Sequence, residues 1–255
     1  MADTTLVDTL ICAAAQAWKD DGEVLATGIG LVPRLAASLA KLTVNPDLMM
    51  TDSEAWLVSE PVPIGPRGDY AVQRESHMGF ARIFDNVWGG KRHAMVGPTQ
   101  IDRYGQANIS MIGSDYRRPR TQMLGVRGYP GNSINHANSF FVPNHSPKVF
   151  VEGEVDMVCS AGYNPGRLAR GWSLDEIDIR LVVTQLCVMD FGGPDHQLRL
   201  RSLHPGVGID QVRQATGFEI HVGDDVGTTP APTEAQLALL ARLDPHGLRA
   251  SALGS

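Results

Sequence analysis

Apolar residues recur at helical spacing in two stretches near the start of the chain. Over residues 6–18 they fall on one stripe and predict an amphipathic helix, and residues 31–42 repeat the pattern. Residues 23–27 indicate a short strand, and residues 48–50 are a short apolar run that is typical of a buried strand. This order of strand, helix and strand predicts a partly parallel sheet with helices on its faces.

The pattern changes in the second half of the chain. Residues 180–184 and 186–191 are rich in β-branched and apolar residues, and a Gly- and Pro-containing turn follows at residues 192–195. Residues 197–202 then alternate between polar and apolar side chains. We expect an antiparallel meander here, which makes the sheet mixed.

Two helices are predicted near the end of the chain. Asp210 is a candidate cap for a short helix that ends at Gly217. Thr233 and Gln236 form a capping-box signal for a last helix that reaches Leu243. Because no repeat, low-complexity tract or linker interrupts the chain, the sequence predicts one domain over residues 1–255.

Two stretches are predicted to be loops. Residues 61–74 are rich in Pro and Gly. Residues 94–139 carry many Gly, Asn, Arg and Tyr residues between short strand-like runs. This composition is typical of loops that face a ligand from a rigid scaffold.

The net charge and the lack of long apolar runs argue against two kinds of partner, nucleic acids and membranes. The formal net charge of -6 argues against a nucleic-acid partner, whose affinity depends on clustered cations. No window approaches the ~18 apolar residues of a membrane helix, and the start of the chain lacks a signal-peptide pattern. We therefore expect no membrane partner and a cytoplasmic location. A local basic cluster suits a small anionic ligand or a solvated loop, and consists of Arg117, Arg118, Arg120 and Arg127.

Several kinds of site receive little support. Cys12, Cys159 and Cys187 lie far apart among apolar neighbours, which predicts buried thiols rather than disulfides or a zinc site. The eight histidines show no metal-ligand spacing. The glycine pair at residues 28–30 lacks the third glycine of a dinucleotide fingerprint, and a tight turn before a helix explains it. We expect neither a metal nor a permanently bound cofactor.

The first candidate site is the polar segment Thr51–Trp56, which follows a short buried run. Ligands of α/β proteins bind at strand ends, and Asp52, Ser53 and Glu54 offer groups for base or nucleophilic chemistry. Alternatively, Asp52 or Ser53 caps the next turn. The residues alone leave both interpretations open.

The second candidate site is the glycine-rich segment of residues 125–132. Three glycines permit positive φ angles and close backbone approach, so successive amides form an anion nest in such loops. Arg127 adds a positive charge and a planar donor fork, which suits an enolate or a thioester oxyanion. Asn135, His136 and Asn138 follow with further hydrogen-bonding groups. The alternative is a plain hairpin turn.

Several segments together resemble the β subunits of class I coenzyme A-transferases, especially the glutaconate type. Residues 100–108 read QIDRYGQAN and are similar to the QxDxxGNxN segment of those proteins. Residues 119–121, 180–184 and 216–219 add matches in the same order, so that the resemblance covers nearly the whole chain. It implies an α/β fold with an open mixed, largely parallel sheet flanked by helices.

The chain departs from this family where a transferase keeps its nucleophilic glutamate. Counting without gaps from Pro46, and backward from Pro61, the family position falls on Ser53, and Glu54 comes one residue late. Neighbouring residues point in different directions, and covalent catalysis does not tolerate such a displacement. Arg127 also stands where the family has glycine.

These departures resemble one clade of the family, the steroid-ring-cleaving hydrolases of steroid-degrading actinobacteria. Residues 125–136, 190–196 and 202–207 are similar to its β subunit. The resemblance implies retro-Claisen hydrolysis of a cyclic β-keto acyl-coenzyme A, the last steroid ring of cholesterol. Coenzyme A is then part of the substrate. The general base is a glutamate of an α subunit, and we expect an α2β2 assembly.

On this basis we predict roles for particular residues. Arg127, with Gly128 beside it, holds the thioester oxygen or ring ketone, while Ser53 and Glu54 lie at the pocket edge. Two alternatives stay open: a genuine coenzyme A-transferase that uses Glu54 as nucleophile, and a β subunit without a catalytic role. A metal-dependent hydrolase has little support from the sequence. The predicted substrate contacts are Asn108, Tyr129, Asn132, Asn135 and His136.

Overall fold

The computed structural model describes residues 4–53 and 55–253. The chain divides into two compact units. The first unit consists of Met1–Val96 with Pro230–Ser255, and the second consists of Gly97–Thr229. The single domain expected from the sequence stays a prediction.

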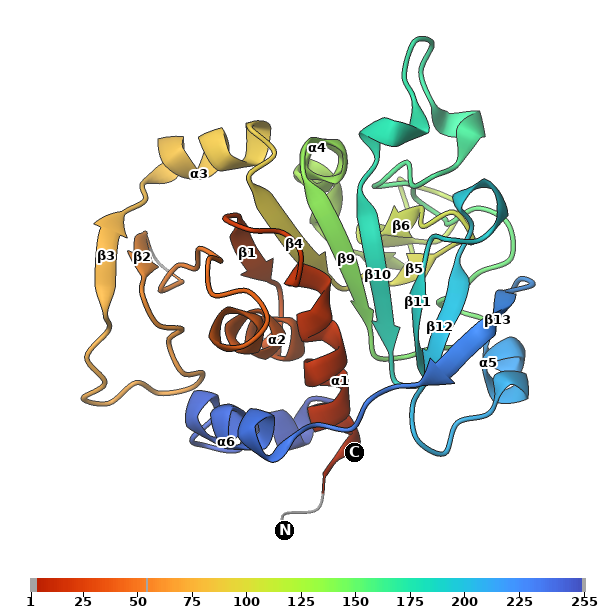
Figure 1. Ribbon diagram of the computed structural model, residues 1–255. Coiled ribbons are helices and arrows are strands. Elements are labelled where there is room, and N and C mark those ends of the chain that lie inside the picture. The colour runs from red at the N-terminus through yellow and green to blue at the C-terminus, as the bar shows by residue number, and fades with distance from the viewer. Residues whose placement is uncertain (1–3, 54, 254–255) are drawn as a thin grey trace. The chain divides into compact units, whose positions relative to one another are not determined.

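The first unit contains helices around a parallel strand pair (Figure 1). Strands β1 and β4 run parallel, with Leu25 opposite Arg92 and Gly28 opposite Met95. Its elements are α1 (Leu6–Ala15), a 3-10 turn (Gln16–Trp18), β1 (Leu25–Gly28), α2 (Leu31–Leu42), β2 (Trp56–Val58), β3 (Arg74–His77), α3 (Phe80–Trp88), β4 (Arg92–Val96), α6 (Glu234–Leu243) and a 3-10 turn (Leu248–Ser251).

The two helices predicted from periodicity are confirmed. In α1 the apolar stripe is buried except for Leu6, and the last predicted turn is a 3-10 turn whose Trp18 indole donates to the His93 carbonyl at 3.2 Å. The turn into α2 needs glycine, because a Cβ on Gly28 would lie 2.1 Å from the Pro33 carbonyl oxygen. The tight-turn interpretation of residues 28–30 therefore holds.

The predicted strand at residues 48–50 is reduced to one parallel bridge, between Leu25 and Met49. Met49 donates to the Val24 carbonyl and accepts from the Ala26 amide, both at 2.9 Å. The segment thus lies beside β1 but is too short for a ladder. The antiparallel pair β2–β3 and the helix α3 were not predicted.

The second unit contains a five-stranded mixed sheet and a set of short hairpins. Its sheet elements are β9 (Ala137–Val142), β10 (Ile179–Thr184), β11 (Cys187–Asp190), β12 (Arg199–Leu203) and β13 (His221–Thr228). The remaining elements are β5 (Gln100–Ile101), β6 (Ala107–Asn108), β7 (Met111–Ile112), β8 (Thr121–Gln122), α4 (Tyr129–Asn135), α5 (Ile209–Ala215) and 3-10 turns at Gly125–Arg127, Pro165–Arg167, Leu174–Glu176 and Pro194–His196.

The predicted meander forms the middle of this sheet (Figure 1). Strands β10, β11 and β12 pair antiparallel, whereas β9 pairs parallel to β10 and β13 pairs parallel to β12. The sheet is therefore mixed, as expected. Its core is apolar, and Phe140, Phe150 and Met189 are fully buried.

Among the other sequence predictions, the cap of α6 is confirmed and the cap of α5 is wrong. Thr233 caps α6 in a capping box with Gln236, as expected. Asp210 does not cap α5, because Gly208 occupies the capping position and Asp210 lies inside the first turn. All three cysteines are buried free thiols. Within residues 4–53 and 55–253, no helix is long and apolar enough to cross a membrane.

Candidate active site

A buried asparagine supports the segment that carries Arg127. The Asn108 side chain is fully buried, and its oxygen accepts from the amides of Ser110 at 3.0 Å and Met111 at 3.3 Å. Its nitrogen donates to the Gln100 side chain at 2.7 Å and to the Met111 carbonyl at 2.6 Å. Because this amide is fully used within the chain, the placement argues against the expected substrate contact.

Gly125 anchors the Arg127 turn on the loop that follows Asn108. The Gly125 amide donates to the Ile109 carbonyl at 3.1 Å. A Cβ on Gly125 would lie 2.1 Å from the Ile109 side chain and 2.6 Å from its carbonyl oxygen, so only glycine fits. The 3-10 turn Gly125–Arg127 therefore has a fixed base, and it presents an exposed Arg127 at its end.

The predicted anion nest is wrong. Gly125, Gly128 and Gly131 all avoid the positive-φ region, and Gly128 has φ -135° and ψ -30°. Residues 129–135 form the short helix α4, with Pro130 in its first turn, where a missing amide hydrogen costs nothing. The amides therefore do not converge on one point. The remaining candidate for anion binding in this segment is the exposed Arg127 guanidinium.

Two more of the predicted substrate contacts, at the two ends of α4, are buried. Tyr129 is 5% exposed, and its hydroxyl lies near Ser160 and Cys159 without hydrogen-bond geometry to a described residue. Burial raises the pKa of this phenol well above its ordinary value. His136 is also 5% exposed, with Nδ1 2.9 Å from the Ala137 carbonyl oxygen. Both placements argue against direct substrate contact.

Asn132 and Asn135 remain half-buried at the surface of α4. The Asn135 amide donates to the Gly131 carbonyl at 2.8 Å. Below them, the buried Asn138 donates to the carbonyls of His136 at 2.7 Å and Asn132 at 3.3 Å. Asn138 thus fixes the end of α4 onto β9. Of the predicted contacts, Asn132 and Asn135 stay available to a ligand.

Two exposed apolar side chains precede Arg127 in the chain. Leu124 is 65% exposed and Val126 is 40% exposed, one before and one within the 3-10 turn. The turn therefore offers a guanidinium and two exposed apolar side chains. This combination suits a ligand with an anionic oxygen on an otherwise apolar acyl part.

In the first unit, Asp52 closes the turn Thr51–Trp56. Its carboxylate is fully buried, accepts from the Trp56 amide at 3.2 Å and pairs with the Arg74 guanidinium at 3.2 Å. The Asp52 amide donates back to the Trp56 carbonyl at 2.9 Å. The capping interpretation is therefore correct for Asp52, and a role as base or nucleophile does not fit its geometry.

Two further arginines hold the backbone of this turn. Arg34 donates to the Thr51 carbonyl at 3.0 Å, and Arg67 donates to the Asp52 carbonyl. Burial lowers the pKa of Arg34, and the nearby Arg67 charge adds to the effect. The clamp holds Ser53 exposed at φ 71°, a conformation that costs a serine roughly 1–3 kcal/mol. Glu54 lies outside the described residues.

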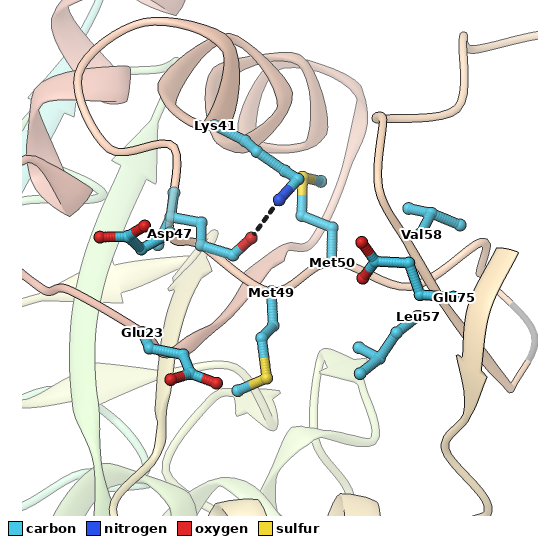
Figure 2. A pocket seen from close by; sticks show the side chains of 9 residues that line it. Glu23, Lys41, Asp47, Met49, Met50, Leu57, Val58 and Glu75 are labelled. Atoms are coloured by element: carbon cyan, nitrogen blue, oxygen red, sulfur yellow. Dashed lines mark hydrogen bonds between the residues drawn. The ribbon is translucent and has the colours of Figure 1, made fainter. Parts of the chain in front are cut away.

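A cavity of about 330 Å³ adjoins this part of the first unit (Figure 2). Glu23, Asp47 and Glu75 line it, and Lys41 donates to the Leu48 carbonyl at 2.6 Å. Three carboxylates disfavour the phosphates of a coenzyme A thioester. The residues predicted for the site do not line it, so we exclude this cavity as the thioester site.

A cavity of about 520 Å³ in the second unit is lined by two cationic side chains. Arg120 from the predicted basic cluster lines it together with Lys148, Gln100 and Asp156. The sequence did not single out Lys148, because only the fold brings it to Arg120. Among residues 4–53 and 55–253, no group of three or more His, Cys, Asp or Glu side chains is placed to hold a metal ion.

The mixed sheet, the QxDxxG hairpin and the braced turn after it are features that the sequence resemblance predicts for a β subunit of the coenzyme A-transferase type. The chain belongs to the class I coenzyme A-transferase family and is a subunit of an enzyme. The cholesterol ring-cleaving hydrolase IpdB subunit of Mycobacterium tuberculosis H37Rv is 42% identical over 96% of this chain and 97% of its own length.

Two further relatives fix this assignment. A 3-oxoadipate CoA-transferase subunit of Pseudomonas knackmussii is 31% identical, over 93% of this chain and 92% of its own. The crystal structure of Rhodococcus jostii RHA1 IpdAB matches with a TM-score of 0.90 and 38% identity, covering 100% of both chains. No family model matches the chain. The family and fold predicted from the sequence are confirmed.

Proposed function

We propose that this chain is the β subunit of a heteromeric hydrolase that opens a cyclic β-keto acyl-coenzyme A, the last ring left from cholesterol. The support is 42% identity to a cholesterol ring-cleaving hydrolase subunit, against 31% to a coenzyme A-transferase subunit. The observation that carries the proposal is the exposed Arg127, on a turn that Gly125 and Asn108 fix in place.

The proposed reaction is a retro-Claisen hydrolysis. Water, activated by a base of the α subunit, adds to the ring ketone. The bond between that carbon and the α carbon of the thioester breaks, and the ketone carbon becomes a carboxylate. The bonding electrons form a thioester enolate, which then takes up a proton.

Arg127 is proposed to bind the oxygen on which negative charge develops. A guanidinium donates charge-assisted hydrogen bonds, which strengthen as the enolate forms. The apolar Leu124 and Val126 side chains beside it suit the carbocyclic part of the substrate. Asn132, Asn135 and Gly128 are proposed to line the same surface, and Ser53 is proposed to lie at the pocket edge.

The assembly follows from the same proposal. Coenzyme A enters as part of the substrate, and no permanent cofactor is required. The α subunit completes the site, consistent with the matched IpdAB structure, whose name joins two different subunits. The α2β2 stoichiometry and the cytoplasmic location stay predictions.

The proposal is tested by producing the chain together with its α subunit. The complex is assayed on a cyclic β-keto acyl-coenzyme A and, separately, for coenzyme A transfer to acetate. We expect ring opening with coenzyme A retained on the product, and no transfer. Transfer without ring opening would refute the proposal.

A genuine coenzyme A-transferase is the second candidate function. The relative at 31% identity is a coenzyme A-transferase subunit, and the sequence resemblance implies that the family's nucleophile position falls on Ser53, which has a strained φ of 71°. This alternative requires a glutamyl-coenzyme A thioester on Glu54. Borohydride or hydroxylamine trapping during turnover, followed by peptide mass spectrometry, detects it.

A further inference from the structure

Helix α3 has two sharply different faces. Its apolar residues fall within an arc of about 140° at 100° per residue, and they are Phe80, Ile83, Phe84, Val87 and Trp88. The other face carries Ala81, Arg82, Asp85 and Asn86. A surface helix of this kind normally turns its apolar face into the core of its own chain.

In this chain the apolar face of α3 is exposed. Phe80 is 85% exposed, Trp88 is 67% exposed and Phe84 is 52% exposed, whereas Val87 is the one buried residue of the helix. At about 200 Å² per ring, the exposed parts sum to roughly 400 Å². This equals about half of the ~800 Å² that each partner contributes to a standard protein interface. We call Phe80, Phe84 and Trp88 the α3 face.

The surroundings of the α3 face add aromatic and cationic groups. His77, just before the helix, packs edge-on against Trp56 with ring centroids 5.2 Å apart. The Arg74 guanidinium lies 5.6 Å from the Trp56 ring centroid, and Trp56 is 36% exposed. Aromatic residues and arginine are the types that protein interfaces favour.

The strand pair before α3 also brings the start of the helix close in space to the Thr51–Trp56 turn. Strands β2 and β3 pair with Trp56 opposite His77, and the Met78 amide donates to the Ala55 carbonyl. Helix α3 begins two residues after Met78 and connects β3 to β4 (Figure 1). A protein that covers the start of α3 therefore lies next to the turn that carries Ser53.

We propose that the α3 face is the docking surface for the α subunit of the enzyme. This inference rests on the proposed function, in which a second, different chain must supply the base. A second copy of this chain would bring only the same side chains, whereas the name of the matched IpdAB structure joins two different subunits. An apolar, aromatic surface beside the Ser53 turn holds the α subunit where it completes the site.

The test measures the affinity between the two subunits. The wild-type complex and its variants are purified after co-expression, and the dissociation constant is obtained by sedimentation velocity over a dilution series. Phe80→Ser and Trp88→Ala should each raise the dissociation constant about tenfold or more, because central aromatic residues dominate interface affinity. The matched controls on the other side of the same helix, Arg82→Ala and Asp85→Ala, should stay within about twofold of wild type.

A second measurement guards against variants that fail to fold. Amide hydrogen exchange of residues 78–90 is compared in the isolated wild-type chain and in the complex. We expect this segment to become protected in the complex with the α subunit. Unchanged exchange together with unchanged dissociation constants overturns the proposal.

Two other outcomes are informative. If the isolated chain self-associates, and the variants abolish this without weakening the affinity for the α subunit, the face pairs with a second copy and the proposal is wrong. If the variants dissociate but the wild-type complex opens no ring, the docking surface stands and the proposed function fails.

Discussion

The glycines around Arg127 serve different purposes. Gly125 is enclosed, since a Cβ would meet the Ile109 side chain and carbonyl oxygen. Gly128 is open, since no heavy atom lies within 4 Å of its Cβ position, and its φ of -135° suits any residue. Packing therefore favours glycine at position 125, whereas position 128 has room for a side chain or a ligand.

This contrast predicts opposite results for two alanine variants. Gly125→Ala should lower the free energy of unfolding by about 1–3 kcal/mol, because the added methyl group overpacks against the backbone. Gly128→Ala should stay within ~0.5 kcal/mol of wild type but slow the reaction if substrate passes over this residue. Thermal unfolding of both variants measures the change in stability, and steady-state kinetics measure the change in rate. A Gly125→Ala protein as stable as wild type would show that packing does not favour glycine at this position.

Arg127 carries the proposed chemistry of this chain. Arg127→Ala should lower kcat by about 10²–10³, as expected for the loss of one oxyanion donor. The melting temperature should not change, because the side chain is exposed. Arg118→Ala, an exposed arginine of the same basic cluster, is the control and should keep the wild-type rate. A wild-type rate for Arg127→Ala would support a β subunit without a catalytic role.

At the scale of elements, a buried histidine joins the sheet of the second unit to α5. His145 lies 3.1 Å from the Thr184 hydroxyl at the end of β10 and 2.9 Å from the Thr216 hydroxyl at the end of α5. Its ring stacks on Phe150 with centroids 3.9 Å apart. Burial lowers the pKa of His145 to about 4.

This pKa shift makes stability depend on pH. In the unfolded chain His145 binds a proton below about pH 6.5, whereas in the folded protein it binds one only below about pH 4. The contribution of His145 is therefore complete above pH 6.5 and is lost as pH falls from 6.5 to 4, by roughly 3 kcal/mol in all. Urea unfolding of wild type and His145→Gln across this range measures it. A constant difference between the two proteins would contradict the account.

Periodicity and capping predicted some elements and missed others. Helices α1, α2 and α6 were predicted because their apolar stripes face the core or their caps are explicit. Helix α4 was missed because its glycines suggested a loop, although Pro130 and the bond from Ser133 to the Pro130 carbonyl support a short helix. Helix α3 was also missed, although its apolar residues recur at helical spacing between Gly79 and Gly89. Unlike the helices that were predicted, it exposes most of its apolar face.

The candidate site was predictable in outline only. The sequence singled out Arg127 and the Thr51–Trp56 turn as candidates, since unusual residue types mark both. It did not reveal that Asn108, Tyr129 and His136 are buried, because burial depends on contacts between distant segments. For the same reason the arginine clamp on Asp52 was missed, since Arg34, Arg67 and Arg74 meet only in the fold.

At the scale of the whole molecule, each of the two units contributes a different feature to the proposed function. The second unit presents Arg127, with Arg120 and Lys148 at a cavity. The first unit presents the clamped Ser53 turn and the α3 face. These features fit a subunit that binds and orients a thioester while another chain activates water.

The source of the new oxygen in the product tests the central claim most directly. The complex with its α subunit is run in water enriched in ¹⁸O, and the ring-opened product is analysed by mass spectrometry. We predict one solvent oxygen in the newly formed carboxylate, with coenzyme A still attached to the product. Coenzyme A found on Glu54 or on an acceptor acid, with no solvent oxygen in a ring-opened product, would contradict the account.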